Sequence, residues 1–407
     1  MAKLRTRKWL LSAFASLICL LAVGLYALAQ APDEGKRDRK VAVTGGTFHA
    51  LPATLETTQW GWLDPQESPK LVVSSGDTVA VETMMHAHNK IQPGTTMDEI
   101  IALRKANPGG GPHSVTGPIY VNGAEPGDVM EIRILKITPK AFATNFNLPG
   151  KEFPTIGALA SEMPDGFVKY FYLDLDKKQA EFKPGITIDL QPFPGTLAVG
   201  IDPKDPSPRK GGSTDPMAPV STLRPWKNGS NMDINEVQAG TTIFIPIFLK
   251  GGLVWTGDSH CRQGNGEVNL TALECSYREI VMQLIVRKDM KLDWPRIETP
   301  THWIMTGFDE DLNKAMVNAV RETVDFLAAQ KHGAADPLRG LLAHLHGGRL
   351  PGEPGGGRPQ GRALHGAQER LRQEVVVRGA LAGALLWLAA APAWGGGTFP
   401  SSPPPPI

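Results

Sequence analysis

The sequence predicts a mostly β protein with few helices. Its apolar segments are short, rich in Val, Ile, Thr and Tyr, and bounded by Gly, Pro, Asn or Asp, as in strands that end at turns. Glycine and proline are frequent, with 44 and 35 copies in 407 residues, which favours many turns over long helices. Apolar residues make up 41% of the chain, which is enough to bury a core and argues against global disorder.

The N-terminus has the pattern of a secretory signal peptide. Basic residues between Lys3 and Lys8 precede an uncharged apolar stretch from Trp9 to Tyr26, and a small-x-small cleavage site ends at Ala29. We expect residues 1–29 to be removed and the mature protein to be periplasmic or secreted. The alternative is an uncleaved anchor, because the apolar stretch is near the lower length limit of a membrane span.

Strands are predicted from Val41 to about Arg287. The whole β-rich region is predicted to span residues 41–332. The clearest strands carry β-branched residues between turn signals: Leu71–Val73, Asp77–Glu82, Ile119–Val121 and Asp128–Ile134.

Two segments carry a helical pattern. Thr96–Lys105 predicts a short helix, and Asp309–Gln330 predicts a longer one because its apolar residues recur at spacings of three or four. Between them, Lys204–Asn231 is polar and rich in Pro and Gly. That segment predicts either a long ordered loop near a site or a crossing between domains.

The composition changes after Lys331. Lys and Asn no longer occur, Ile returns only as Ile407, and Arg, Gly, Ala, Leu and Pro dominate. We expect residues 333–407 to be a low-complexity tail, read in a shifted frame or disordered, without helical or strand periodicity. The alternative is a natural linker with an apolar end at Gly379–Trp394, which is shorter than the ~18 residues of a membrane-spanning helix.

The charge balance and the missing motifs exclude several classes of protein. Lys+Arg is 42 and Asp+Glu is 41, so the basic excess of a nucleic-acid binder is absent. We expect no nucleic-acid partner, and no stable membrane partner after signal cleavage. The chain has no G-x-S-x-G, H-E-x-x-H, phosphate-loop or C-x-x-C motif. Cys261 and Cys275 remain in the mature chain, where an oxidising compartment permits a disulfide, but their spacing equally fits two separate buried thiols.

The segment Val81–Asn89 offers a first set of candidate metal ligands. If it forms a strand, Glu82, His86 and His88 point to one face, because side chains repeat every two residues. Neutral imidazole and carboxylate are ligands that Zn²⁺ prefers. The alternative is two surface histidines on a loop after a strand.

A second segment, Trp255–Glu267, is denser in such residues. Asp258 and His260 have the same i, i+2 relation, and the turn signal Asn265-Gly266 would bring Glu267 back toward them. The alternative is a set of core and turn residues. His113, in a Gly/Pro-rich loop before a strand, is a third candidate, for which an exposed or capping role is the alternative.

Four blocks, in order, resemble the acetamidase/formamidase family. They are TGPIYVNGAEPGD (Thr116–Asp128), Phe193–Gly195, Asn231–Asp233 followed by Gly240–Thr242, and GDSHCRQGNGE (Gly257–Glu267). The resemblance covers about residues 41–332. It implies jelly-roll-like or β-sandwich and barrel-like parts, and a metal-dependent hydrolase that converts short amides to a carboxylate and ammonia, usually as a homo-oligomer.

The resemblance turns the candidate residues into a predicted active site. We expect a divalent metal, Zn²⁺ in the first place, on His86, His88, Asp258 and His260, with one position open for water. Because a catalytic zinc site usually has three protein ligands, the alternative is that one of these four contacts a ligand rather than the metal. Glu82 or Glu267 would act as the acid–base catalyst. Asn231 and Asp233, which match the family's Asn-Met-Asp, would orient the small amide substrate together with His113.

Two alternatives to this function stay open. The family often has Glu where Asn122 stands and Asp where Asn265 stands, and the loss of two carboxylates would favour a non-catalytic secreted protein that binds a metal or ligand. The long loop Lys204–Lys227 would instead suit an amidohydrolase that acts on larger or cyclic amides.

Overall fold

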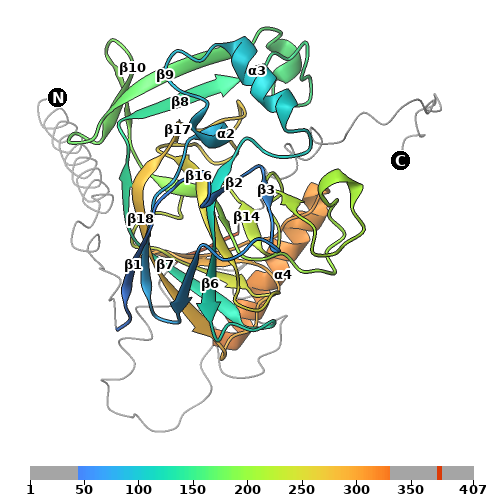
Figure 1. Cartoon of the computed structure of the whole chain (residues 1–407). Coiled ribbons are helices and arrows are strands. Elements are labelled where there is room, and N and C mark those ends of the chain that lie inside the picture. The colour runs from blue at the N-terminus through green and yellow to red at the C-terminus, as the bar shows by residue number, and fades with distance from the viewer. Residues whose placement is uncertain (1–44, 331–373, 378–407) are drawn as a thin grey trace, which may run out of the picture. The chain divides into compact units, whose positions relative to one another are not determined.

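The computed structural model describes residues 45–330 and 374–377. The predicted signal peptide and nearly all of the predicted tail lie outside these ranges. The mostly β prediction is confirmed, since the chain folds into two large sheets and one two-stranded sheet (Figure 1).

The first sheet has eight strands. Their order is β1 (Phe48–Leu51), β5 (Thr78–Val81), β18 (Tyr277–Arg287), β7 (Val129–Pro139), β15 (Thr242–Pro246), β19 (Arg296–Glu298), β20 (His302–Met305) and β21 (Glu374–Val377). The long antiparallel pair β18–β7 lies near its centre.

The second sheet has eleven strands. The order along its main path is β11 (Ile186–Asp189), β10 (Gln179–Lys183), β9 (Phe167–Asp174), β8 (Phe142–Asn147), β17 (Glu274–Cys275), β16 (Val254–His260), β12 (Phe193–Ala198) and β14 (Gly229–Asn231). Off this path, β6 (Ser114–Asn122) pairs with β16, β2 (Thr58–Trp60) and β4 (Leu71–Ser74). The third sheet joins β3 (Trp62–Leu63) to β13 (Val220–Ser221).

No sheet in the described residues closes on itself. The barrel-like part that the resemblance implied therefore takes the form of open sheets.

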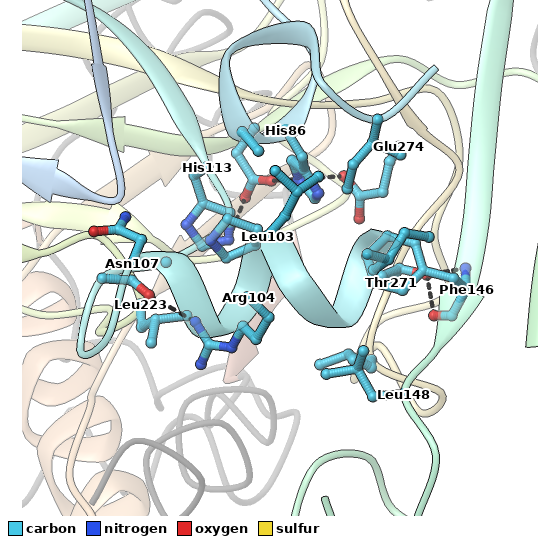
Figure 2. A pocket seen from close by; sticks show the side chains of 18 of the residues that line it. His86, Leu103, Arg104, Asn107, His113, Phe146, Leu148, Leu223, Thr271 and Glu274 are labelled. Carbon is cyan, nitrogen blue, oxygen red and sulfur yellow. Dashed lines mark hydrogen bonds and ion pairs between the residues drawn. The ribbon is translucent and has the colours of Figure 1, made fainter. Parts of the chain in front are cut away.

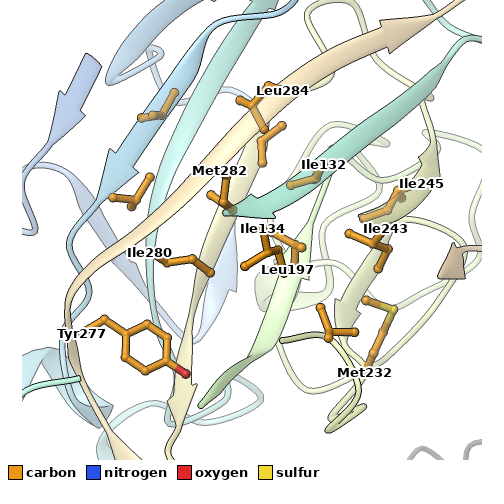
Figure 3. Packing of buried hydrophobic residues seen from close by; sticks show 14 of the residues in the cluster. Ile132, Ile134, Leu197, Met232, Ile243, Ile245, Tyr277, Ile280, Met282 and Leu284 are labelled. Atoms are coloured by element: carbon orange, nitrogen blue, oxygen red, sulfur yellow. The ribbon is translucent and has the colours of Figure 1, made fainter. Parts of the chain in front are cut away.

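The main core contains side chains from both large sheets. Ile132 on β7 lies opposite Leu284 on β18, and Ile134 lies opposite Met282. These four side chains pack in one cluster with Leu197 of β12 (Figure 3). Each fully buried aliphatic side chain of this kind contributes about 1.5–3 kcal/mol by leaving water, so the sheets are held together mainly by this core.

Both predicted helices are present. Helix α3 (Met97–Ala106) begins at a capping box in which Thr96 and Glu99 exchange hydrogen bonds, and α4 (Leu312–Gln330) occupies the second predicted segment. The apolar spacing does not mark the buried face of α4, since Leu312 and Met316 are exposed whereas Ala315, Ala319 and Phe326 are buried. Two short 3-10 helices occur at Ala160–Glu162 and Lys210–Gly212. Within the described residues, no helix has both the length and the apolar character needed to cross a membrane.

Two segments differ from what the sequence predicted. The strand before the histidines ends at Val81, and His86–Asn89 form a short helical turn, α2, in which Ala87, His88 and Asn89 have positive φ. The prediction that Glu82, His86 and His88 share one strand face is therefore wrong. In the tail, where no strand was expected, Glu374–Val377 pair as β21 in parallel with β20, in keeping with a run of β-branched valines.

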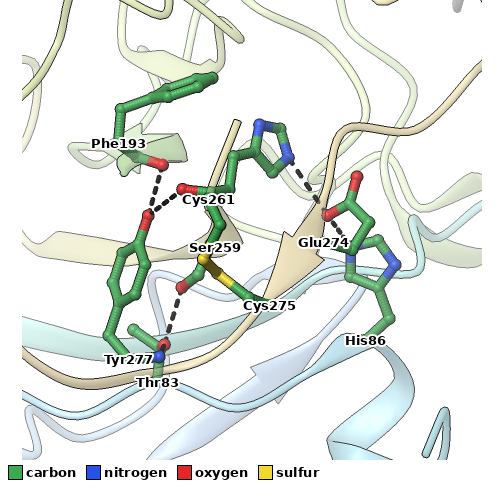
Figure 4. The surroundings of a disulfide bond; sticks show 9 residues. Thr83, His86, Phe193, Ser259, Cys261, Glu274, Cys275 and Tyr277 are labelled. Carbon is green, nitrogen blue, oxygen red and sulfur yellow. Dashed lines mark hydrogen bonds and ion pairs between the residues drawn. A yellow bond between two sulfur atoms is a disulfide. The ribbon is translucent and has the colours of Figure 1, made fainter. Parts of the chain in front are cut away.

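A disulfide joins Cys261, just after β16, to Cys275 on β17 (Figure 4). Both cysteines are buried. Beside the bond, the Tyr277 hydroxyl lies 2.5 Å from the carbonyl oxygen of Phe193 and 2.7 Å from that of His260. The disulfide thus decides the pairing question that the sequence left open, and it fixes β16 against β17.

Replacing both cysteines by alanine should lower the free energy of unfolding by about 3 kcal/mol, because the bond closes a loop of 14 residues in the unfolded chain. Urea unfolding of the variant and of the oxidised and reduced wild-type protein measures this. Two reactive thiols in the unreduced, unfolded protein would contradict the assignment.

Candidate metal centre and active site

Strand pairing in the second sheet brings the predicted site residues together. On β16, Asp258 and His260 have the predicted i, i+2 relation, and His260 lies opposite Glu274 of β17. Asp258 has a φ of 51°, a left-handed conformation that is uncommon for a residue other than glycine and turns the strand locally. His86 reaches the same place from α2.

These four residues, His86, Asp258, His260 and Glu274, form what we call the four-residue cage. His86 Nε2 lies 2.9 Å from Asp258 Oδ1 and 3.1 Å from Glu274 Oε2. His260 Nε2 lies 3.4 Å from the same oxygen of Asp258 and 3.2 Å from the same oxygen of Glu274. In a tetrahedral zinc site with bonds of about 2.0–2.1 Å, ligand atoms are about 3.3 Å apart, and these four distances between imidazole and carboxylate atoms are of that size.

Several polar atoms of the cage have no hydrogen-bond partner in the described structure. They are His86 Nδ1, both ring nitrogens of His260 and Glu274 Oε2. All four side chains are buried, and a buried polar atom without a partner costs free energy. The set of two imidazoles and two carboxylates fits a divalent cation. Of these atoms, His260 Nε2 and Glu274 Oε2 belong to the cage and would be bonded by it.

The electrostatics of the cage favour positive charge. Burial disfavours the imidazolium form of His86, but Glu274 and Asp258 outweigh burial and raise its pKa to about 9. The same two carboxylates raise the pKa of His260 well above its usual range, against burial. Burial disfavours the carboxylate of Glu274, yet His260 and His86 lower its pKa to about 2. Two buried carboxylates thus require positive charge beside them, which either protons or a metal ion can supply.

His113 lies at the edge of the cage, with Nε2 3.7 Å from Asp258 Oδ2 and Nδ1 2.9 Å from the Thr222 hydroxyl. Burial lowers its pKa to about 4, so its ring is neutral at pH 7. Asn231 lies nearby at the end of β14, where its Oδ1 accepts a hydrogen bond from the Thr196 hydroxyl at 3.2 Å.

Asp233 and Glu267 lie on the far side of His260. Asp233 Oδ1 is 3.8 Å from His260 Nδ1, and burial raises the pKa of Asp233 to about 7. Burial also raises the pKa of Glu267 well above its usual range, with Asp233 adding to the effect. The turn at Gly266 therefore brings Glu267 back to the site, as its sequence pattern predicted.

Overlapping sets of ligand atoms extend the cage on both sides. Among the described residues, three sets have ligand atoms that all lie within 4.8 Å of one another: His86, His113 and Asp258; Asp258, His260 and Glu274; Asp233, His260 and Glu267.

Two predicted site residues are not in this cluster. The Glu82 carboxylate accepts hydrogen bonds from Lys140 Nζ at 2.8 Å and from the backbone N–H of Ala53 at 3.2 Å. His88 packs against the Trp60 ring, 5.9 Å between centroids. Both predictions assumed a straight strand through residues 82–88, whereas the chain turns there.

Glu274 takes the place of His88 as the fourth residue of the cage, and the sequence analysis did not identify it. Glu274 is not at a typical metal-ligand spacing from another candidate ligand in the sequence. It lies beside His260 only because β17 pairs with β16. Cys261 and Cys275 each follow one of these two ligands, which is the only sequence signal that could have linked them.

Asn122 and Asn265, where the family often has carboxylates, are exposed. Asn265 bonds to Glu236 and the backbone of Asn235, and neither asparagine belongs to the cluster. Their identity therefore removes no carboxylate from the cage.

A cavity of about 790 Å³, which includes open solvent at its mouth, leads to the cage (Figure 2). His86, Asp258 and Glu274 line it together with His113, Asn231 and Glu267. Figure 2 shows Phe146 and Leu148 on one side and Arg104 beside Leu223 on another. Asp233 is not among the lining residues, so it contacts His260 from behind rather than a molecule in the cavity.

The chain matches the model of the acetamidase/formamidase family over residues 58–210 and 212–332. It belongs to this family. It is 30% identical over 200 residues to an acetamidase of Mycolicibacterium smegmatis, which covers 39% of this chain and 49% of that protein. It is 27% identical over 219 residues to a formamidase of Methylophilus methylotrophus, with 42% and 52% covered. The chain thus spans about half the length of these relatives.

Solved structures of the family share the fold. An acetamidase structure from Bacillus halodurans superposes with a TM-score of 0.60 at 24% identity, covering 73% of this chain and 90% of that one. A predicted acetamidase/formamidase from Thermoanaerobacter tengcongensis gives 0.62 at 24% identity, with 74% and 89% covered.

Gly195, in the family block Phe193–Gly195, has no side chain, and the cluster occupies the space where one would lie. A Cβ atom at this position would lie 2.6 Å from Asp233 Oδ1, from Asp258 Oδ2 and from His260 Cε1. Only glycine avoids displacing these three side chains.

Gly195→Ala should therefore weaken Zn²⁺ binding by more than about tenfold. Mutation of a residue that contacts metal ligands commonly has an effect of this size. Titration with a competing chelator measures the affinity, and circular dichroism checks the fold. Gly264→Ala is the matched control, because a Cβ there meets nothing within 4 Å. Equal affinities in the two variants would refute the role of Gly195.

Proposed function

We propose that this protein is a metal-dependent amidase that hydrolyses a short linear amide to a carboxylate and ammonia. The observation that carries the proposal is the four-residue cage, in which two imidazoles lie 2.9–3.4 Å from two carboxylates and three of the four residues line a cavity. Family membership supports the reaction class.

Zn²⁺ is the cation that best suits the cage, because two imidazoles and two carboxylates are ligands that it prefers. His86, Asp258, His260 and Glu274 would hold it. When bound, such a cation supplies Lewis acidity toward the amide carbonyl. Asp233 would orient His260 through its Nδ1 side.

Two cavity residues would orient the amide. His113 is neutral, and its Nδ1 lies 2.9 Å from the Thr222 hydroxyl. In the tautomer in which Thr222 donates to Nδ1, the N–H is at Nε2, which lies 3.7 Å from Asp258 Oδ2. That N–H can donate to the amide oxygen. Asn231, whose Oδ1 is held by Thr196, contributes an amide group to the same wall.

Glu267 would move the protons. It lines the cavity, is half-buried and lies in one ligand set with Asp233 and His260. Its carboxylate would accept a proton from the attacking water and return it to the amide nitrogen as the C–N bond breaks, which releases ammonia.

We further propose that the mature protein begins near Gln30 and works as a homo-oligomer in the periplasm or outside the cell. The signal-like N-terminus and the Cys261–Cys275 disulfide support an oxidising compartment. Exposed apolar side chains on β9 to β11, including Phe167, Phe182 and Ile186, support contact with a second copy.

The proposal predicts metal-dependent ammonia release from formamide or acetamide. Chelation should abolish release and Zn²⁺ should restore it. No release from folded, zinc-loaded protein with any amide would refute the amidase function and favour a metal- or ligand-binding protein.

Asp258→Asn should lower kcat/KM at least about a hundredfold, because it removes a charged ligand of the cage. Asparagine tolerates the positive φ at this position, so the fold should persist. His88→Gln, outside the cluster, is the control and should keep activity within about twofold of wild type. Full activity of Asp258→Asn would rule out the cage as the catalytic site.

A further inference from the structure

We propose that the substrate amide has a second, anionic end: its acyl chain ends in a carboxylate that Arg104 binds. This inference rests on the proposed amidase function and names the substrate class of the same site. It arises from a positively charged side chain in the cavity wall that the reaction itself does not use.

Arg104 lies on α3 and lines the cavity. Its Nη1 donates to the carbonyl oxygen of Gly110 at 2.6 Å, and no carboxylate among the described residues lies within ion-pair distance of it. The half-buried guanidinium groups of Arg224 and Arg296, in contrast, have Asp205 and Glu322 as partners.

A guanidinium group has five N–H donors in a planar fork that matches a carboxylate. One donor of Arg104 is used, so the fork retains donors for a ligand. Burial alone lowers the pKa of Arg104, which means that lost hydration is not offset by a neighbouring acid. A carboxylate in the cavity would supply that missing partner.

Much of the cavity wall is apolar. Its lining includes Ile100 and Leu103 of α3 together with Phe146, Leu148 and Leu223. Figure 2 shows the Arg104 guanidinium beside Leu223 and apart from Glu274. Methylene groups of an acyl chain would gain free energy from this wall, whereas formamide and acetamide consist of little beyond the amide group.

The charges also set the direction in which such a substrate binds. Asp258, Glu274 and Glu267 also line the cavity, and Figure 2 shows Arg104 on the side away from Glu274. A substrate carboxylate is repelled by the acids and attracted by the guanidinium, so the amide group is left to face the cage.

The test compares matched pairs of amides on zinc-loaded protein. Succinamate, glutaramate, adipamate and pimelamate end in a carboxylate, whereas butanamide, pentanamide, hexanamide and heptanamide end in a methyl group. At the best chain length, kcat/KM for the carboxylate-ended amide should exceed that of its partner by at least about tenfold, mainly through KM.

Arg104→Gln should abolish this preference. Lys105→Gln, on the adjacent exposed residue that pairs with Glu152, is the matched control and should retain it. Equal kcat/KM within every pair, or a preference that survives in Arg104→Gln, would overturn the proposal while leaving the amidase function intact.

A binding measurement separates the two proposals if no amide is hydrolysed. Adipamate and hexanamide have the same chain length and differ only in the terminal carboxylate. Calorimetry should show at least about tenfold tighter binding of adipamate to wild-type protein and no difference with Arg104→Gln. That result without turnover would refute the amidase function but keep the Arg104 site; equal binding to wild type would refute the site.

Discussion

The structure depends on one electrostatic constraint, the burial of two carboxylates within 3.4 Å of two imidazoles. Asp258 and Glu274 cannot both be ionised in this place without positive charge beside them, because burial removes most of their hydration. Protonated His86 and His260 can supply that charge through their Nε2 atoms, whereas His86 Nδ1 has no hydrogen-bond partner in the described structure. A divalent cation held by the four side chains would supply it as well. The cage is therefore a candidate metal centre.

The surrounding fold holds the cage in register. Strand β16 carries Asp258 and His260, and the disulfide after His260 ties it to the strand that carries Glu274. Tyr277 bridges β12 and β16 through two backbone carbonyls, and Gly195 on β12 keeps side-chain atoms out of the cluster. These ligands come from segments that are more than 170 residues apart in the chain, so only the complete pair of sheets can assemble them.

Local patterns in the sequence predicted what depends on local geometry. The β class, both helices and the i, i+2 pair Asp258 and His260 follow from residue periodicity, and all are present. His88 and Glu82 were misplaced because Ala87, His88 and Asn89 adopt positive φ, which no residue type in that segment requires. Glu274 was missed because its role arises from pairing between strands, which has no signature in the spacing of ligands. The sequence analysis gave His113 a role in substrate binding. In the structure His113 also lies in one set of possible metal ligands with His86 and Asp258.

The most direct test of the metal centre is a crystal structure of the zinc-loaded protein with anomalous diffraction data at the zinc absorption edge. The account predicts an anomalous peak bounded by His86 Nε2, His260 Nε2, Asp258 Oδ1 and Glu274 Oε2. A peak at His88, or a fully loaded protein with no peak among these four atoms, would contradict it.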